Sequence, residues 1–103
     1  MRNLADTFKE SADAVTAGDY AKALECLIWI HDNPDPSHPS NEMWRRAFGF
    51  LALGTLAEVY EPAKAKLVEL VTAKRERIAT GLADEAMQAD LRSLEERLRD
   101  LEA

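Results

Sequence analysis

The chain has 103 residues, a net charge of −6 and a single cysteine, Cys26. A chain of this length folds as one domain with its own core, and its acidic balance argues against general binding to nucleic acid or anionic membranes, both of which favour basic surfaces. One cysteine excludes an internal disulfide and a multi-cysteine zinc site. The longest apolar run, residues 47 to 57, is shorter than the roughly 20 residues that cross a bilayer, and the first ten residues show no apolar signal core. We therefore expect a cytoplasmic protein that uses no metal or other cofactor.

Helical spacing organises the first part of the chain into two helices. Apolar residues recur along the first helix at intervals of four, four and three: Leu4, Phe8, Ala12 and Val15. Gly18 is expected to end this helix and Asp19 to cap the next one, because glycine suits a helix end and a short carboxylate suits a helix start. The second helix is expected to run from Tyr20 to about Asp32.

Residues 31 to 40, HDNPDPSHPS, contain both histidines and three of the four prolines. This segment is either a metal or catalytic site or a rigid connection between two helices. Strong zinc motifs place their ligands at fixed spacings that are missing here, whereas proline stops helices and stiffens the chain. We interpret the segment as a hinge, with His31 capping a helix end and His38 in solvent.

The next helix, from Met43 to Val59, is apolar on almost every side, which is typical of a central helix. Ser40 or Asn41 is suited to cap its start. Gly49 and Gly54 each cost about 1 kcal/mol relative to alanine in a helix interior. We expect close approach of a neighbouring helix to offset this cost.

Two further helices complete the chain. Pro62 is expected at the first position of the fourth helix, and Gly81 at its end. The last helix, from about Asp84, carries apolar residues at alternating spacings of four and three: Met87, Leu91, Leu94, Leu98 and Leu101. This apolar seam covers only about two heptad repeats. It either packs back onto the third and fourth helices or pairs with a second copy, in which case Leu91, Leu94, Leu98 and Leu101 are oligomerisation residues.

Two stretches carry a resemblance to a known family. GDYAKALE, residues 18 to 25, resembles the second helix of a tetratricopeptide repeat, and residues 44 to 67 are similar to a second, stretched repeat. The chain is also similar to a group of small bacterial tetratricopeptide-like proteins. That likeness rests on Trp29, His31, Asn33, Arg45, Phe48, Tyr60, Pro62 and Ala63. It covers roughly residues 18 to 80 and implies a fold and a binding role rather than a reaction.

The expected fold is all-α, with about five helices. Residues 1–82 form antiparallel helical hairpins of the tetratricopeptide-like type, and residues 83–103 form an amphipathic C-terminal helix that packs or dimerises. Repeat arrays usually need three or more units for stability, so either the last helix or a second copy must cover the open end. We favour a small homodimer over a monomer.

No set of residues in the sequence has the pattern of a catalytic site. Cys26 lies in mid-helix beside apolar residues, where a thiol is usually inert packing. The chain has no nucleophile elbow, no phosphate-binding glycine loop and no paired-carboxylate signature. We therefore expect a protein that is not an enzyme.

Five residues are the candidates for a partner-binding surface: Trp29, His31, Arg45, Arg46 and Tyr60. Trp29 shares a helix face with polar residues and is either tucked under a neighbouring helix or presented to a partner. Arg45 and Arg46 stand early in a helix, where the dipole disfavours cations. They either pair with the loop that contains Asp32 and Asp35 or bind a carboxylate of a partner.

Two classes of function are compatible with these features. The first is a non-enzymatic interaction module, which holds a protein or peptide on the concave face between the first and third helices. The alternative is a small acidic inhibitor or immunity-type protein that neutralises a toxin or nuclease. Such an inhibitor of a basic target should show one continuous acidic face and a strong dependence of affinity on salt.

Overall fold

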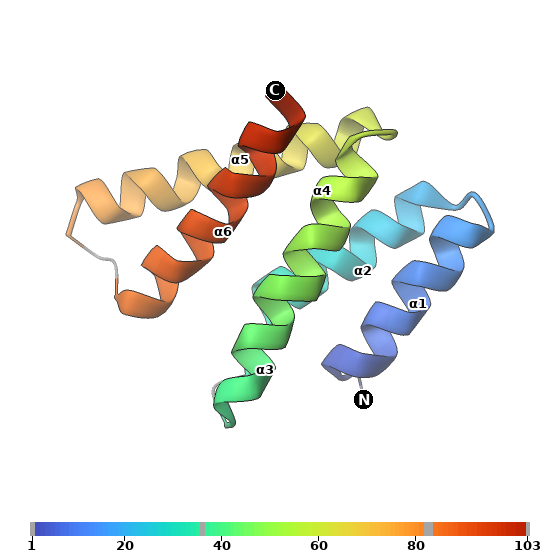
Figure 1. The fold of residues 1–103 in the computed structure, drawn as a ribbon, viewed down its shortest axis with the longest axis horizontal. Helices are drawn as coiled ribbons and strands as arrows, with labels where there is room; N and C mark the ends of the chain where they lie inside the picture. Colours follow the sequence, from blue (N-terminus) through green and yellow to red (C-terminus); the bar gives the residue numbers. More distant parts are fainter. Residues whose placement is uncertain (1, 36, 82–83, 103) are drawn as a thin grey trace.

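The computed structural model describes residues 2–35, 37–81 and 84–102, and within these ranges it contains helices and connecting loops but no strand. The helices are α1 (Leu4–Thr16), α2 (Tyr20–Asp32), α3 (Pro39–Trp44), η1 (Arg45–Phe50), α4 (Leu51–Ala57), α5 (Glu61–Ala79) and α6 (Glu85–Glu102). Because α3, η1 and α4 follow one another without a break, they form one helix, called the central helix below, residues 39–57 (Figure 1). The all-α fold of about five helices is confirmed. None of the described helices is both long enough and apolar enough to cross a membrane.

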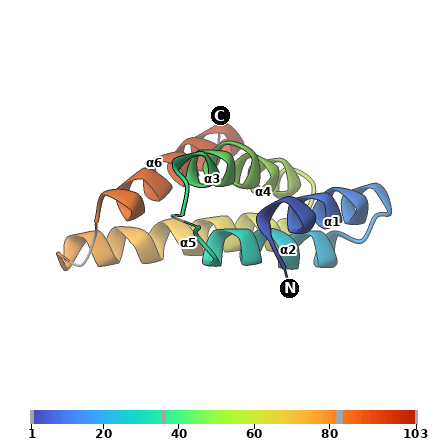
Figure 2. The same ribbon diagram turned by 90° about the horizontal axis from the view of Figure 1, so that it is seen from below.

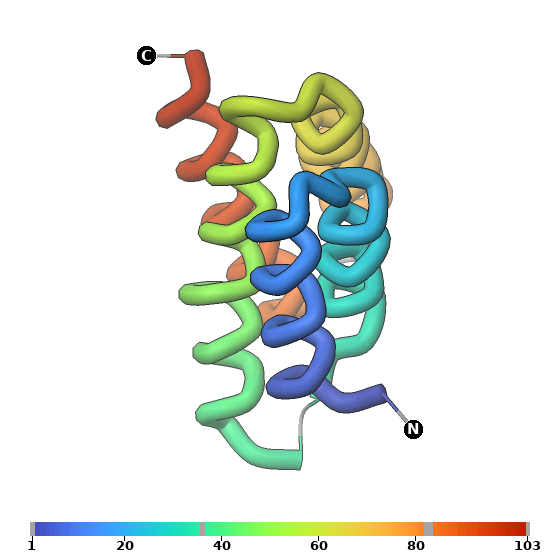
Figure 3. The backbone as a smooth tube through the Cα atoms, turned by 90° about the vertical axis from the view of Figure 1, so that its right-hand side faces the viewer, coloured from blue at the N-terminus to red at the C-terminus, as the bar shows by residue number. Residues whose placement is uncertain are grey.

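The helices lie in two layers. Figure 2 shows α1, the central helix and α6 in one layer and α2 and α5 in the other. The chain therefore alternates between the layers, and each helix packs against the next one in the sequence. The central helix lies between α1 and α6, and α1 runs beside it in the same direction (Figure 3).

Local capping explains most of the helix boundaries. The Asp19 carboxylate accepts a hydrogen bond from the backbone N–H of Lys22 at 3.2 Å, and Gly18 adopts the left-handed conformation with φ 77°, so both predictions for this turn are confirmed. The predicted cap of the central helix is wrong. His38 caps it, because its Nδ1 accepts the backbone N–H of Ser40 at 3.1 Å, and Pro39, which has no N–H, takes the first helical position.

The α5 and α6 boundaries lie close to the predicted ones. Helix α5 begins at Glu61, one residue before Pro62, and is followed by Gly81 in the left-handed conformation with φ 78°. Helix α6 begins at Glu85, and the Asp84 carboxylate accepts the backbone N–H of Met87 at 2.8 Å. The predicted boundary between residues 82 and 83 lies outside the described residues.

The connection between α2 and α3 is held by hydrogen bonds. The Asp35 carboxylate accepts from the backbone N–H of Ser37 at 3.1 Å and from the side-chain amide of Asn41 at 2.9 Å. The Asp35 backbone N–H donates to the Glu42 carboxylate at 3.0 Å. Pro36 lies outside the described residues. Among those described, no group of three or more His, Cys, Asp or Glu side chains is arranged to hold a metal ion.

The core lies between the two layers and depends on close helix contact. A Cβ atom at Gly49 would lie 2.8 Å from Cγ2 of Ile30, and one at Gly54 would lie 3.2 Å from Cβ of Arg97. The expected close approach at both glycines is therefore confirmed. Gly49 lies in η1, a stretch of wider helical turns in the middle of the central helix.

The C-terminal helix packs onto its own chain. Leu94 is fully buried and Leu91 is buried beside it, while Leu98 and Leu101 are partly buried against the same core. The guanidinium of Arg75 on α5 also binds the α6 carboxylate of Glu95 at 2.6 Å. Of the two alternatives for the heptad seam, the structure shows the seam docked onto α5 and the central helix, so its first two leucines are not an exposed dimer surface.

Candidate interaction groove

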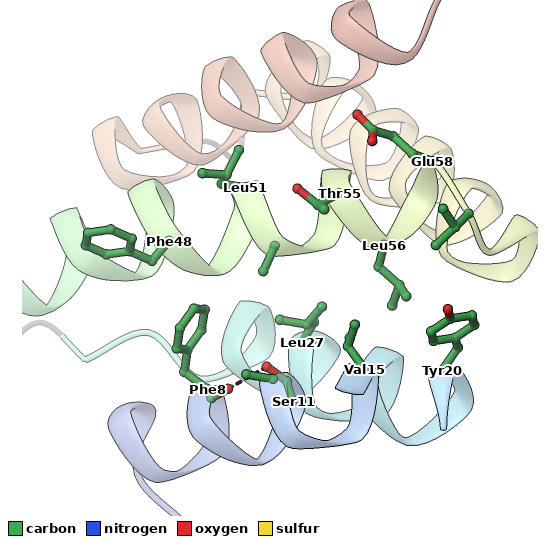
Figure 4. A pocket seen from close by; sticks show the side chains of 13 residues that line it. Phe8, Ser11, Val15, Tyr20, Leu27, Phe48, Leu51, Thr55, Leu56 and Glu58 are labelled. Carbon is green, nitrogen blue, oxygen red and sulfur yellow. Dashed lines mark hydrogen bonds between the residues drawn. The ribbon is translucent and has the colours of Figure 1, made fainter. Parts of the chain in front are cut away.

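An open groove of about 590 Å³ lies between α1 and the central helix (Figure 4). Phe8 and Val15 line it from α1, and Phe48 and Leu51 line it from the central helix. Leu27 of α2, only 3% exposed, lies between these two walls and forms the floor. The groove occupies the concave face between the first and third predicted helices, where the sequence placed a binding surface.

The groove exists because α1 and the central helix both pack on α2 but stay apart from each other over most of their length. Aromatic pairs mark its two ends. At one end the ring centroids of Phe8 and Trp44 are 5.1 Å apart and nearly perpendicular, and Phe48 lies against the same indole. Near the other end the Tyr20 and Tyr60 rings are 5.8 Å apart. Of these pairs, Phe8–Trp44 joins α1 to the central helix, and Tyr20–Tyr60 joins α2 to the corner before α5.

The walls of the groove leave large apolar side chains in solvent. Val15 is 42% exposed, Phe48 50%, Leu51 45% and Val59 66%. Isolated exposed apolar residues are common on protein surfaces, whereas contiguous apolar patches are typical of interaction surfaces. The groove therefore has the composition of a recognition surface.

Among the residues that line the groove, Glu58 is the charged one, but its carboxylate lies on the side of α4 that faces α6 (Figure 4), where it borders a second, small pocket with Arg97 and Asp100. Glu58 directly follows the last residue of α4, where the helix dipole is negative. Among the described residues, no lysine, arginine or histidine forms an ion pair with this carboxylate.

Two of the predicted contact residues, Trp29 and Tyr60, do not line the groove. Trp29 is partly buried against the core, and the guanidinium carbon of Arg2 lies 5.9 Å from its ring centroid. Tyr60 is the residue before α5 and packs on Tyr20 at the corner between α4 and α5.

Arg45 lies inside the fold, with 1% of its surface exposed. Its Nε donates to the backbone carbonyl of Ile30 at 2.9 Å, and its Nη2 donates to the carbonyl of His31. Its two terminal nitrogens also bind both oxygens of the Asp90 carboxylate, each at 3.0 Å. Arg45 thus satisfies the free carbonyls at the C-terminal end of α2 and fixes α6 through Asp90. It is not part of a contact surface.

Arg46 joins the same network from a position nearer the surface. Its side chain is 23% exposed, and its Nε donates to Asp90 at 2.7 Å. Its Nη2 lies 3.6 Å from the Glu42 carboxylate. The predicted pairing of the two arginines with the loop of Asp32 and Asp35 is wrong, because their main partner, Asp90, comes from α6.

His31 lines a polar cavity of about 430 Å³ with Arg45, Lys74 and Asp90. Burial lowers the pKa of the His31 imidazole, and its hydrogen bond with the Asp32 carboxylate offsets this shift only in part. Burial also lowers the pKa of the Lys74 ammonium. Burial would raise the pKa of Asp90, but hydrogen bonds from Arg45 and Arg46 hold that pKa below its usual range.

Most of the charged groups around the polar cavity are paired and support the fold, but the buried Nε2 of His31 has no hydrogen-bond partner among the described residues. The carboxylate of Asp90 is neutralised by two guanidinium groups, and the ring of His31 is 9% exposed. At the end of α2, Arg45 binds the carbonyls of Ile30 and His31, and the Asn33 side chain binds that of Trp29, so His31 does not cap this helix as predicted. Cys26 is fully buried and burial raises the pKa of its thiol, in line with the expected packing role.

Three residues that form much of the groove wall were not among the predicted contact residues: Phe48, Leu51 and Val59. One signal for them was present. The central helix is apolar on almost every side, and a fold of two layers can cover only part of such a helix. Some of its apolar residues therefore had to remain in solvent.

Comparison with known proteins gave no match to a family model, to a curated protein or to a solved structure. The tetratricopeptide-like resemblance stays a prediction.

Proposed function

We propose that this protein is a non-enzymatic interaction module of the tetratricopeptide-like type that binds a protein or peptide segment in the groove between α1 and the central helix. The observation that carries this proposal is the exposure of large apolar side chains around a concavity between two helices that Phe8 and Trp44 join at one end. A site of this kind needs little rearrangement before a partner binds, which lowers the cost of association.

The size of the exposed apolar surface fits a protein partner. Burying a whole Leu, Val or Phe side chain contributes about 1.5–3 kcal/mol, and Phe48, Leu51 and Val59 each leave roughly half or more of their surface in solvent. Covering these three side chains would contribute a few kcal/mol in total, of the order found for a small binding hot spot. No reacting group is needed for this role.

Site-specific photo-crosslinking in the native cell tests the proposal. A photoreactive amino acid is placed at Thr55, which is exposed on the groove wall, and in a matched variant at Glu69, which is exposed on α5 in the other layer. We expect discrete protein adducts from position 55, absent from position 69 and removed by an additional Phe48→Asp change. Equal labelling from both positions, or no protein adduct from position 55, would contradict the proposal.

A further inference from the structure

We propose that His31 is a pH-dependent switch: when its imidazole binds a second proton, the ring turns out of the interior into solvent and opens the polar cavity toward the Phe50 side chain in the core. The switch does not involve the groove, so it goes beyond the proposed function. In the structure His31 is 9% exposed, and the centroid of its ring lies 5.7 Å from that of Phe50.

The hydrogen bonds of the ring define its protonation in the buried position. Its Nδ1 lies 2.8 Å from the Asp32 carboxylate. Since a carboxylate only accepts, Nδ1 carries the proton of the neutral ring, and Nε2 is left with a lone pair. Nε2 is buried and has no hydrogen-bond partner among the described residues. A second proton would therefore be placed on an atom that solvent does not reach and that faces no acceptor within the described chain.

Two cations from other helices oppose a protonated ring in the buried position. The guanidinium of Arg45 on the central helix and the ammonium of Lys74 on α5 line the same cavity as His31, and both repel a third positive charge there. Burial has the largest effect on the pKa of the ring, and these two cations lower the pKa further. The ring is therefore neutral for as long as it stays beside Phe50.

The carboxylates of the cavity compensate little of this cost. Four of them line it: Asp32 of α2, Glu42 of α3, Asp84 before α6 and Asp90 of α6. Arg45 already binds the carboxylates of Glu42 and Asp90, and that of Asp84 accepts the backbone N–H of Met87. Among the described residues, Asp32 is the carboxylate that contacts the ring. Its side chain is 57% exposed, so water screens its attraction for a buried charge.

The exposure of Asp32 also gives the protonated ring a position in solvent. His31 is the residue before the last one of α2 and borders the open cavity, so its side chain lies at the edge of the core. In solvent the ring can keep the Asp32 carboxylate as the acceptor of Nδ1–H and gain water as the acceptor of Nε2–H. This removes the cost of a buried donor without an acceptor. The ring leaves Phe50, which is 1% exposed in the structure, uncovered on the side of the cavity.

NMR spectroscopy of the isotope-labelled protein tests the switch. The pH is lowered from about 8 until the imidazole is protonated or the fold is lost. The nitrogen chemical shifts of His31 report when the ring binds its second proton, and the nuclear Overhauser cross-peak between the His31 and Phe50 rings reports whether they stay in contact. The cross-peak between Phe8 and Trp44, whose ring centroids are 5.1 Å apart, is the internal reference for an intact fold.

We expect the cross-peak between His31 and Phe50 to disappear in parallel with protonation of the ring, while the cross-peak between Phe8 and Trp44 persists. Asp32→Asn should move this loss to lower pH, because the Asp32 carboxylate raises the pKa of the ring. The control is His38→Asn, which changes the other histidine of the chain and keeps a side chain suited to cap a helix. It should leave the pH of the loss unchanged.

Three results would overturn the inference. The first is a cross-peak between His31 and Phe50 that persists after the imidazole is fully protonated, since the ring would then hold its charge in place. The second is the loss of both cross-peaks at the same pH, because the ring would then move only when the whole chain unfolds. The third is a loss that occurs at the same pH in Asp32→Asn as in the unchanged protein.

Discussion

The two flanks of the central helix differ in what they do with their side chains. On one flank, Arg45 is buried and all its donors face carbonyl or carboxylate oxygens of α2, α6 and its own helix. On the other flank, Phe48 and Leu51 remain half exposed around a groove that the described chain leaves open. A charged side chain is therefore buried on one flank, called the closed flank below, and apolar side chains are exposed on the other. This is the reverse of the usual arrangement, in which apolar residues are buried and charged residues are exposed.

This contrast separates architecture from binding. A charge enters a protein interior only when other groups compensate it, so a buried arginine with a complete set of partners has no capacity left for a ligand. An apolar side chain in solvent retains its full capacity to gain free energy when it is covered. The type of a side chain therefore says less about its role than whether its interactions are already satisfied.

The largest expected effect is on the closed flank. Asp90→Ala leaves the Arg45 guanidinium buried without its carboxylate, and we expect a loss of about 3–5 kcal/mol in the free energy of unfolding, measured by urea denaturation. Asp100→Ala, whose carboxylate is 63% exposed on the same helix, should change stability by less than about 0.5 kcal/mol. Similar losses from both changes would show that the buried network is not what fixes α6.

A second prediction compares two leucines of α4. Leu53 is 1% exposed and Leu51 is 45% exposed, two positions apart. We expect Leu53→Ala to cost about 2–5 kcal/mol, because it leaves a cavity in the core, and Leu51→Ala to cost about 1 kcal/mol or less, because its side chain is half in solvent. Leu51→Ala should weaken the binding of the partner more than Leu53→Ala does, because only Leu51 lines the groove. Equal stability losses, from thermal or urea unfolding, would place Leu51 in the core and remove it from the groove.

The third prediction concerns pH on the closed flank. The pKa of His31 is lowered in the folded chain, mainly by burial, with Lys74 and Arg45 adding to the shift and Asp32 opposing it. The unfolded chain therefore binds more protons below the ordinary value of 6.5. Stability should be constant above that pH and fall as the pH decreases toward the folded pKa, by at most about 1.4 kcal/mol per pH unit.

Urea midpoints measured from pH 8 down to about pH 5 check this dependence, and His31→Gln supplies the control. The variant should lose the slope in this window. Asp90 also has a lowered pKa, but its contribution to stability is lost only as the pH falls below the ordinary carboxyl value of 3.8, so it does not affect this range. A slope that persists in His31→Gln would assign the effect to another group.

The smallest expected effect comes from Thr7, which is 1% exposed and whose hydroxyl has no hydrogen-bond partner among the described residues. The polar groups of Arg45 exchange their hydrogen bonds to water for hydrogen bonds within the protein. The Thr7 hydroxyl loses its hydrogen bonds to water on folding and gains no partner in exchange. Thr7→Val keeps the shape and should raise stability by about 1 kcal/mol. Thr16→Val, at an exposed hydroxyl that donates to the carbonyl of Ala12, should show no such gain. A loss of stability in Thr7→Val would reveal a partner for the buried hydroxyl.

The sequence alone determined the local features of this protein. The spacing of apolar residues specified the helices, Gly18 and Asp19 specified the first turn, and Gly49 and Gly54 indicated close helix contacts. These features follow from short-range rules of periodicity, capping and helix propensity, which act within a few residues of the chain. The apolar character of the central helix also placed it in the middle of the fold.

Only the tertiary structure decided which side chains were satisfied. Arg45 finds Asp90 across 45 positions of sequence, and no local rule indicates that pairing. In the same way, Leu51 and Leu53 are identical in type, and the packing of α1 and α2 against the central helix decides that one faces the groove and the other the core. Burial depends on which distant helices meet, because the free energy of a side chain is set by its neighbours in space.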